Sequence, residues 1–148
     1  MKLFIGADHA GFDLKEALKK KLSGTLELID LGTDSTESCD YPDIAADLCH
    51  EVLKNSDSLG LLICGSGLGM SMAANKIHGI RAACVSEPIS AGLSRKHNNA
   101  QILCLGARII SEDQALNCLN AFLNESFDHQ HQRHQQRIDK ISKLEENY

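Results

Sequence analysis

The sequence predicts an α/β fold: a three-layer Rossmann-like sandwich with a five-stranded parallel sheet and a C-terminal helix. Apolar strand patterns and amphipathic helix patterns alternate five times along the chain, and the connections between them are short. No internal repeat or linker interrupts this alternation. The chain has 148 residues, of which 43% are hydrophobic and 24% charged, which favours one folded domain over residues 1–148.

Five segments have the composition of strands. Residues 59–64 are the clearest, because Leu61, Leu62 and Ile63 form an apolar run typical of a central parallel strand that is covered on both faces. The first strand begins almost at the N-terminus. In chain order we expect strands at residues 2–7, 26–31, 59–64, 80–85 and 101–105.

Each strand is followed by a segment with helical periodicity. In residues 12–22 the apolar side chains fall on one helical face and the lysines on the other, and residues 43–54 also place their apolar side chains on one face. The C-terminal helix would place Ile138, Ile141 and Leu144 on its apolar side. We expect helices at residues 12–22, 43–54, 70–76, 87–96, 112–124 and 129–144.

Composition and charge exclude several classes of function. The formal net charge is −5, so the chain lacks the overall positive charge typical of nucleic-acid-binding proteins, and we expect no nucleic-acid partner. No apolar stretch approaches the ~20 residues that span a bilayer, so we expect no membrane partner. The N-terminus enters a strand without the layout of a signal peptide, which predicts a cytoplasmic location.

The cysteine pattern predicts neither a disulfide scaffold nor a zinc site. A chain that can build a core does not need disulfides, and no pair of cysteines has the local spacing of zinc ligands. We therefore expect most of the cysteines to be small buried apolar residues. The six are Cys39, Cys49, Cys64, Cys84, Cys104 and Cys118.

A glycine-rich loop, Gly65-Ser66-Gly67-Leu68-Gly69, directly follows Cys64. Its G-x-G-x-G spacing and its place after the third strand argue against a dinucleotide-binding motif, and the Gly-Lys-Ser/Thr ending of a P-loop is missing. A tight turn would explain some of these glycines. Three in five residues favour an anion or oxyanion cradle, in which successive N–H groups converge. Cys64 could then be a base, a nucleophile or a core residue.

Polar residues gather where other strands are expected to end. Asp8 and His9 follow the first strand, and Arg108 follows the fifth, at the edge where α/β folds bind ligands. Asp8 could equally cap the next helix, and Arg108 could form a surface salt bridge. His97 and Asn98 lie between the fourth helix and the fifth strand, where a histidine could cap the helix or act as an acid–base group.

The C-terminal segment carries the clearest basic cluster. Arg133 and Arg137 are four residues apart, so on a helix they share a face and could bind one phosphate; a solvated surface is the simpler interpretation. His129, His131 and His134 could bind a metal, but the sequence suggests no carboxylate or cysteine beside them, and we expect no metal site.

Taken together, these motifs resemble the ribose-5-phosphate isomerase B family, which also includes the subunits of galactose-6-phosphate isomerase. The matching stretches occur in the family's order over almost the whole chain. They are Gly6 to Gly11, Asp40 to Pro42, Cys64 to Gly69, Ala73 to Lys76, Gly79 to Ala82, Leu93 to Asn98, Gly106 to Arg108 and Arg133 to Arg137. Ser66 stands where relatives often have threonine, and either hydroxyl suits the same role.

The resemblance implies an isomerase of the pentose phosphate pathway that interconverts ribose 5-phosphate and ribulose 5-phosphate through an enediolate, without metal or organic cofactor. Cys64 would be the base that carries the proton between C2 and C1, favoured as a thiolate by the loop N–H groups. Ser66 would hydrogen-bond the sulfur, and His97 would open the sugar ring as an acid–base group. The enediolate oxygens would be stabilised by the N–H groups of Gly65, Ser66, Gly67, Leu68 and Gly69.

The resemblance also implies how the sugar phosphate is bound. Asp8 and Asn98 would hold ring hydroxyls, and Tyr41 would line the site. The phosphate would be bound by His9, Arg108, Arg133 and Arg137. In the family the site lies between two subunits, so we expect a homodimer or tetramer in which His97, Asn98 and Arg108 serve the Cys64 of the neighbouring subunit.

Two other functions fit the same sequence. An isomerase of allose 6-phosphate or galactose 6-phosphate would need a longer distance between Cys64 and the arginines. A noncatalytic module that binds a phosphosugar or a nucleotide would keep the fold and the anion-binding loop without any turnover.

Overall fold

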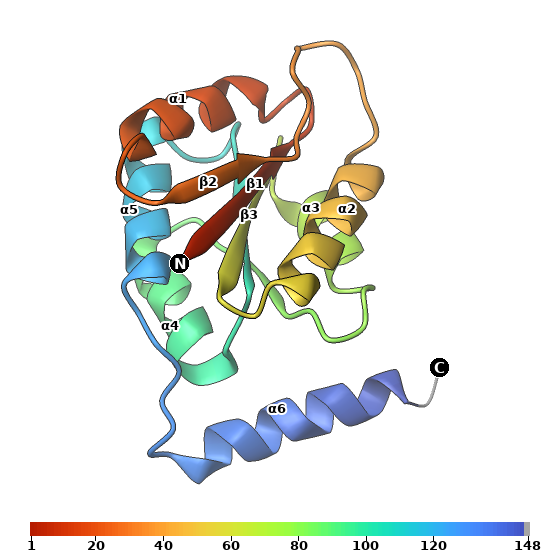
Figure 1. The fold of residues 1–148 in the computed structure, drawn as a ribbon, viewed down its shortest axis with the longest axis vertical. Coiled ribbons are helices and arrows are strands. Elements are labelled where there is room, and N and C mark those ends of the chain that lie inside the picture. The colour runs from red at the N-terminus through yellow and green to blue at the C-terminus, as the bar shows by residue number, and fades with distance from the viewer. Residues whose placement is uncertain (147–148) are drawn as a thin grey trace.

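The computed structural model describes residues 1–146, and its centre is a parallel sheet with strand order β2-β1-β3-β5-β4 (Figure 1). Helices α1, α4 and α5 cover one face of the sheet, and α2 and α3 cover the other. The strands are β1 (Lys2–Ala7), β2 (Glu27–Asp30), β3 (Ser58–Cys64), β4 (Ala82–Cys84) and β5 (Ile102–Gly106). The helices are α1 (Phe12–Leu22), α2 (Tyr41–Lys54), α3 (Leu68–Ala74), α4 (Pro88–Asn98), α5 (Glu112–Leu123) and α6 (Gln132–Glu145).

The predicted α/β sandwich with its five-stranded parallel sheet and C-terminal helix is confirmed. Strand β3 is buried along its whole length because β1 and β5 flank it and helices cover both faces. Each face has its own apolar core, one beneath α1 and α5 and one beneath α2 and α3. In the part of the chain that is described, no helix is long and apolar enough to span a bilayer.

Several predicted boundaries were wrong by a few residues. β4 covers three residues rather than six, since it lies at the edge of the sheet and pairs only with β5. α2 begins at Tyr41, two residues earlier than predicted, because Pro42 is well suited to the first turn of a helix. α4 extends to Asn98, so His97 and Asn98 belong to its last turn rather than to the connection after it.

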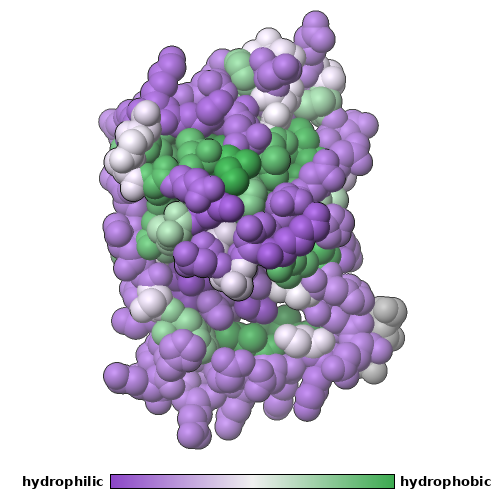
Figure 2. All heavy atoms as spheres, viewed as in Figure 1, coloured by the Kyte–Doolittle hydropathy of each residue, from purple (hydrophilic) through white to green (hydrophobic). Residues whose placement is uncertain are grey.

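Helix α6 lies across the amino-terminal edge of the sheet, next to the C-terminal end of α4 (Figure 1). The ring of His134, near its start, stacks on the ring of His97 in α4, with centroids 4.5 Å apart. Near its end, both carboxylate oxygens of Glu145 accept the N–H of Gly79, at 2.9 and 3.0 Å. Between α6 and the body lies a hollow of about 590 Å³ whose apolar lining includes Ile141 and Leu144, and Figure 2 shows a hydrophobic band there.

A buried lysine ties α1 to the segment after β2. Lys15 is only 1% exposed, and its Nζ donates to Oδ2 of Asp30 at 2.6 Å and to the carbonyl of Thr33 at 2.7 Å. Burial by itself would raise the pKa of Asp30, but hydrogen bonds from Lys15 and Lys19 outweigh it and hold that pKa below its ordinary value. The stabilisation from Asp30 is therefore present above its unfolded-state pKa and is lost as pH falls through the lower folded-state pKa.

We expect Asp30→Asn to destabilise the protein by about 3 kcal/mol, because it leaves the Lys15 charge buried with a weaker set of partners. Lys15→Met should cost less, since it removes the buried charge and leaves Asp30 paired with Lys19. Urea unfolding of both variants at neutral pH measures the two effects. Equal losses of unfolding free energy in the two variants would show that the unpaired charge of Lys15 does not cause the destabilisation by Asp30→Asn.

Candidate active site

The carboxyl ends of β1, β3 and β5 meet at one edge of the sheet, and Cys64 lies at the centre of that edge. Cys64 is opposite Gly106 in the β3–β5 register, and the N–H of Asp8 donates to the carbonyl of Ile63 at 3.2 Å. The chain order of the strands reverses direction between β1 and β3, and α/β sheets bind ligands at such a switch point. Three of the predicted site segments therefore come together here.

The glycine-rich loop folds back over the sulfur of Cys64. The N–H of Gly67 donates to Sγ at 3.2 Å, and Gly67 has a φ of +79°, a left-handed conformation that favours glycine. The side chain of Cys64 is buried, at 4% exposure. The loop is thus shaped so that a main-chain donor points at the sulfur.

Ser66 makes a different contact from the one expected. Its Oγ accepts the N–H of Leu68 at 3.3 Å, while the donor to the Cys64 sulfur is the N–H of Gly67. The tight turn explains why a main-chain donor takes the place expected for Ser66, because it brings the N–H of Gly67 back to the sulfur. Two of the five loop N–H groups, those of Gly67 and Leu68, therefore already have acceptors.

Tyr41 and Arg108 lie against the loop. A Cβ on Gly69 would come within 2.6 Å of the Tyr41 ring, so only glycine allows this close approach. A Cβ on Gly65 would lie 3.3 Å from Nη1 of Arg108, and the Arg108 N–H donates to the carbonyl of Gly65 at 2.9 Å. The Tyr41 ring thus lies against the glycine-rich loop, and its role in lining the site stays a prediction.

The guanidinium of Arg108 lies beside the glycine-rich loop of its own chain, and its role at the Cys64 of a neighbouring subunit stays a prediction. The position beside the loop follows from the sheet order. β5 pairs directly with β3, and Arg108 follows Gly106, the residue that faces Cys64 in the register.

Asp8 and His9 are both fixed by main-chain donors. Asp8 is 5% exposed, and its Oδ1 accepts the N–H groups of Ala10 and Gly11 at 3.0 and 3.1 Å. This carboxylate oxygen closes the turn before α1, but the N-cap residue of α1 is Gly11 and no side chain caps the helix, so the helix-capping interpretation of Asp8 was wrong. Nδ1 of His9 accepts the N–H of Cys39 at 3.3 Å, which assigns the ring proton of a neutral His9 to Nε2, where it can be donated to a ligand.

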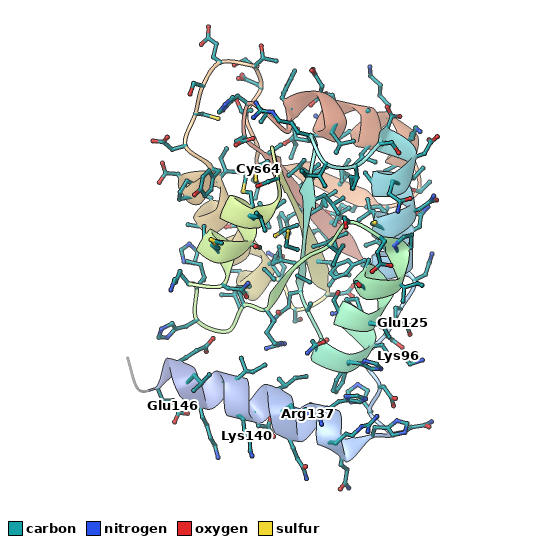
Figure 3. The ribbon with its side chains drawn as sticks, turned by 180° about the vertical axis from the view of Figure 1, so that it is seen from behind. Cys64, Lys96, Glu125, Arg137, Lys140 and Glu146 are labelled. Atoms are coloured by element: carbon teal, nitrogen blue, oxygen red, sulfur yellow. The ribbon has the colours of Figure 1, made fainter. Side chains whose placement is uncertain are left out.

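The remaining predicted site residues lie at the opposite end of the molecule. Helix α4 begins after the carboxyl end of β4 and runs back along the sheet, so the rise from Pro88 to His97 is about 14 Å. Arg133 and Arg137 are exposed and four residues apart on α6, which lies near that end of α4. In Figure 3, Lys96 in the last turn of α4 and Arg137 on α6 both lie far from Cys64. Within one chain, the structure separates His97, Asn98, Arg133 and Arg137 from Cys64.

The sequence analysis also missed a carboxylate beside the C-terminal histidines. Oδ2 of Asp128 lies 2.6 Å from Nδ1 of His131, and this hydrogen bond lowers the pKa of Asp128. Burial lowers the pKa of His134, which favours its neutral form. Asp128 was overlooked because it precedes the predicted helix by one residue. Its position three residues before His131 could have predicted the contact between the two side chains.

The other cysteines differ sharply in their surroundings. Burial raises the pKa of Cys49 to about 12 and raises that of Cys104 well above its ordinary value, so both are the buried apolar residues that the sequence predicted. Cys84 is exposed at the end of β4, where a Cβ on Gly67 would lie 3.0 Å from its sulfur. No local pattern predicts this position of Cys84, because it depends on the pairing of β4 with β5.

Comparison with known proteins finds relatives that match almost the whole chain. A family model described as Ribose/Galactose Isomerase matches residues 3–141. The ribose-5-phosphate isomerase B of Escherichia coli is 41% identical over 146 residues, which cover 98% of this chain and 97% of that protein.

Two solved structures have the same fold. The ribose-5-phosphate isomerase B of Clostridium thermocellum is 42% identical, with a TM-score of 0.95 over 100% of this chain and 99% of that one. The enzyme of the same name from Mycoplasma genitalium, crystallised with bound ribulose 5-phosphate, is 40% identical, with a TM-score of 0.92 over 99% of this chain and 97% of that one. Since the family model spans nearly the whole sequence and these relatives cover almost all of it, the chain belongs to the ribose/galactose isomerase family.

Proposed function

We propose that this protein is an aldose–ketose isomerase that interconverts ribose 5-phosphate and ribulose 5-phosphate. The observation that carries the proposal is the placement of Cys64 at the carboxyl end of the central strand, with a main-chain donor 3.2 Å from its sulfur. The E. coli relative has this activity in its name, and the M. genitalium relative was crystallised with the ketose product.

In the proposed reaction, Cys64 acts as a thiolate base above the sugar carbons. It removes the proton from C2 of the open-chain aldose, the C2–H electron pair forms the C1–C2 double bond, and the C1–O1 π pair moves onto O1, which gives an enediolate. The O2 hydroxyl proton then passes to O1, the C1–C2 π pair takes the proton back from the thiol at C1, and the electron pair on O2 forms the carbonyl at C2, which gives the ketose and restores the thiolate. The hydrogen bond from Gly67 stabilises negative charge on the sulfur before the transfer.

The glycine-rich loop would also stabilise the negative charge on the enediolate oxygens. Because the N–H groups of Gly67 and Leu68 already donate to Cys64 and Ser66, we assign this role to the N–H groups of Gly65, Ser66 and Gly69. Removing one such donor from an oxyanion hole typically costs about 3 kcal/mol of transition-state stabilisation. Asp8 would hold a sugar hydroxyl with Oδ2, since Oδ1 already accepts the N–H groups of Ala10 and Gly11.

We further propose that two copies of the chain complete one site. His97 and Asn98 of a second copy would reach the sugar bound over Cys64 of the first, with His97 opening the furanose ring. The separation of these residues from Cys64 within one chain supports this arrangement, since Figure 3 shows Lys96, in the same last turn of α4, far from Cys64. The apolar side chains of α6 support it too, since Ile141 and Leu144 are 41% and 61% exposed in a single chain.

The phosphate would be bound by donor groups from both copies. His9 follows the carboxyl end of β1 and Arg108 lies against Gly65 of the same chain, whereas Arg133 and Arg137 would come from the second copy. A five-carbon substrate must span the distance between the sulfur and these donor groups. A hexose 6-phosphate is one carbon longer, and the family description, which includes galactose, makes it the alternative substrate to test.

A direct assay tests the proposed function. The protein is incubated with ribose 5-phosphate in the presence of a metal chelator, and the ketose formed is measured. We expect turnover under these conditions, with a higher kcat/KM for ribose 5-phosphate than for allose 6-phosphate or galactose 6-phosphate. A strong hexose preference would overturn the substrate assignment, and binding of the pentose phosphate without turnover would indicate a noncatalytic module.

Replacing Arg137 by alanine should mainly raise KM for ribose 5-phosphate, by roughly 10-fold or more, because a charge-assisted hydrogen bond to the phosphate contributes about 1.5–3 kcal/mol. Steady-state kinetics separate this effect from a change in kcat. Lys20→Ala, which removes the same charge from α1, is the matched control and should leave KM unchanged. An unchanged KM in Arg137→Ala would argue against a phosphate contact.

A further inference from the structure

The segment that joins α5 to α6 brings three metal-binding side chains together. Asp128 precedes α6, His131 is its N-cap residue, and His134 lies in its first turn. One potential ligand atom from each residue lies within 4.8 Å of the other two, and Oδ2 of Asp128 is 2.6 Å from Nδ1 of His131. The three residues, which we call the Asp–His–His cluster, lie far from Cys64 within one chain (Figure 3), and none of them is assigned a step in the proposed reaction.

Two members of the cluster are held in place before any ligand binds. The side chain of Asp128 is 15% exposed, and its N–H donates to the carbonyl of Lys96 at the end of α4, at 2.9 Å. His134 is 5% exposed, and its ring is packed between the rings of His97 and His131. His131 is 59% exposed, so it can move to complete a coordination sphere.

We propose that the Asp–His–His cluster binds one Zn²⁺ ion and thereby clips α6 to the end of α4. Two imidazoles and a carboxylate are a donor set that zinc commonly takes, with water in the fourth position. With bonds of about 2.0–2.2 Å, the ligand atoms of a tetrahedral zinc lie about 3.3 Å apart. Asp128 and His131 must therefore separate slightly, and the widest gap must close by roughly 1.5 Å, which rotation of the exposed His131 can supply.

The surroundings allow the ion to enter. Asp128 and His131 line an open hollow of about 340 Å³ that Asp139 also lines, so a second carboxylate is close to the entrance. These acidic groups offset the positive charges of Arg133 and Arg137, which are exposed on the same helix. A zinc ion here joins the Asp128 segment, α6 and, through the Asp128–Lys96 hydrogen bond, the last turn of α4. The consequence is a firmer attachment of α6.

Metal binding is measured on the full chain by calorimetric titration with Zn²⁺ and by absorption spectroscopy with Co²⁺. Because cysteines can also bind both ions, the spectrum is essential: Co²⁺ bound by nitrogen and oxygen gives visible d–d bands without the near-ultraviolet charge-transfer band of a thiolate ligand. We expect one equivalent bound without that band. A thiolate band at the first equivalent would overturn the proposal.

Three variants locate the site. His131→Gln and Asp128→Asn should each weaken Zn²⁺ binding by at least ~10-fold, because each removes one of three ligands. His129→Gln is the matched control, since His129 is an exposed histidine in the same stretch but outside the cluster. The affinity of this variant for Zn²⁺ should equal that of the wild type.

A thermal measurement checks the clip independently. Saturating Zn²⁺ should raise the melting temperature of the wild type and of His129→Gln, but not that of His131→Gln. Melting in chelator verifies that each variant is folded. Equal binding or equal stabilisation in all variants would show that zinc binds elsewhere. None of these readouts depends on isomerase activity, so the zinc site and the proposed function can fail separately.

Discussion

Replacing Cys64 by alanine should lower kcat for ribose 5-phosphate by ~10²–10⁴-fold, because the variant loses the only group proposed to carry the proton between C2 and C1. The fold should persist, since alanine fits the buried end of β3 without strain. The main-chain bonds to the carbonyls of Cys64 and Gly65 remain, and only the bond from the Gly67 N–H to the sulfur is lost. Binding of ribose 5-phosphate should persist as well, because the phosphate contacts do not involve the sulfur. Steady-state kinetics together with calorimetric binding measure both effects.

Cys84→Ala is the matched control for this experiment. Cys84 is the exposed cysteine close to the glycine-rich loop, and it has no role in the proposed reaction. Its replacement should leave kcat within about twofold of the wild type, an effect far below that of losing a general base. If Cys64→Ala kept near-wild-type turnover, the proton would have to move through another group, and the proposed mechanism would be wrong.

His97→Asn should lower turnover of ribose 5-phosphate by ~10²-fold or more, since the sugar arrives mainly as a closed furanose and the variant has no acid–base group to open it. A four-carbon aldose 4-phosphate provides the comparison. Its O4 is esterified, so it cannot close a furanose ring, and its turnover should be much less affected.

An exposed histidine on α2, His50, gives the control variant His50→Asn, which should match the wild type on both substrates. Equal losses of His97→Asn on the ring-forming and the open-chain substrate would remove the ring-opening role of His97. That result would still leave a role in positioning the sugar.

Local sequence patterns predicted the order of the elements but not the exact end of α4. The apolar periodicity weakens after Leu93, so the sequence predicted that the helix ends at Lys96. The helix continues to Asn98, because Asn99 adopts a left-handed φ of +45° and its N–H caps the carbonyls of Ser94 and Arg95. Asparagine tolerates this conformation better than most residues, so the repeated asparagines were the overlooked signal.

The candidate site was predictable only where a residue's place follows from its own strand. Asp8 and Cys64 end strands in the sequence, so their positions at the carboxyl edge could be predicted. The place of Arg108 depends on the order of strands in the sheet, which puts β5 rather than β4 beside β3. No local pattern contains this information, because it arises from packing of the whole domain. The Asp128–His131 contact was missed for the simpler reason that Asp128 lies just outside the predicted helix.

The central claim is that Cys64 of one chain works with His97 of another, and mixing two inactive variants tests it most directly. Cys64→Ala and His97→Asn are each purified, mixed in equal amounts, dissociated and reassembled, and turnover of ribose 5-phosphate is measured. In a mixed dimer, one site combines the intact Cys64 with the intact His97, so random pairing should restore about a quarter of wild-type activity. If the mixture remained as inactive as its components, Cys64 and His97 would not act together across subunits, and the proposed shared site would be contradicted.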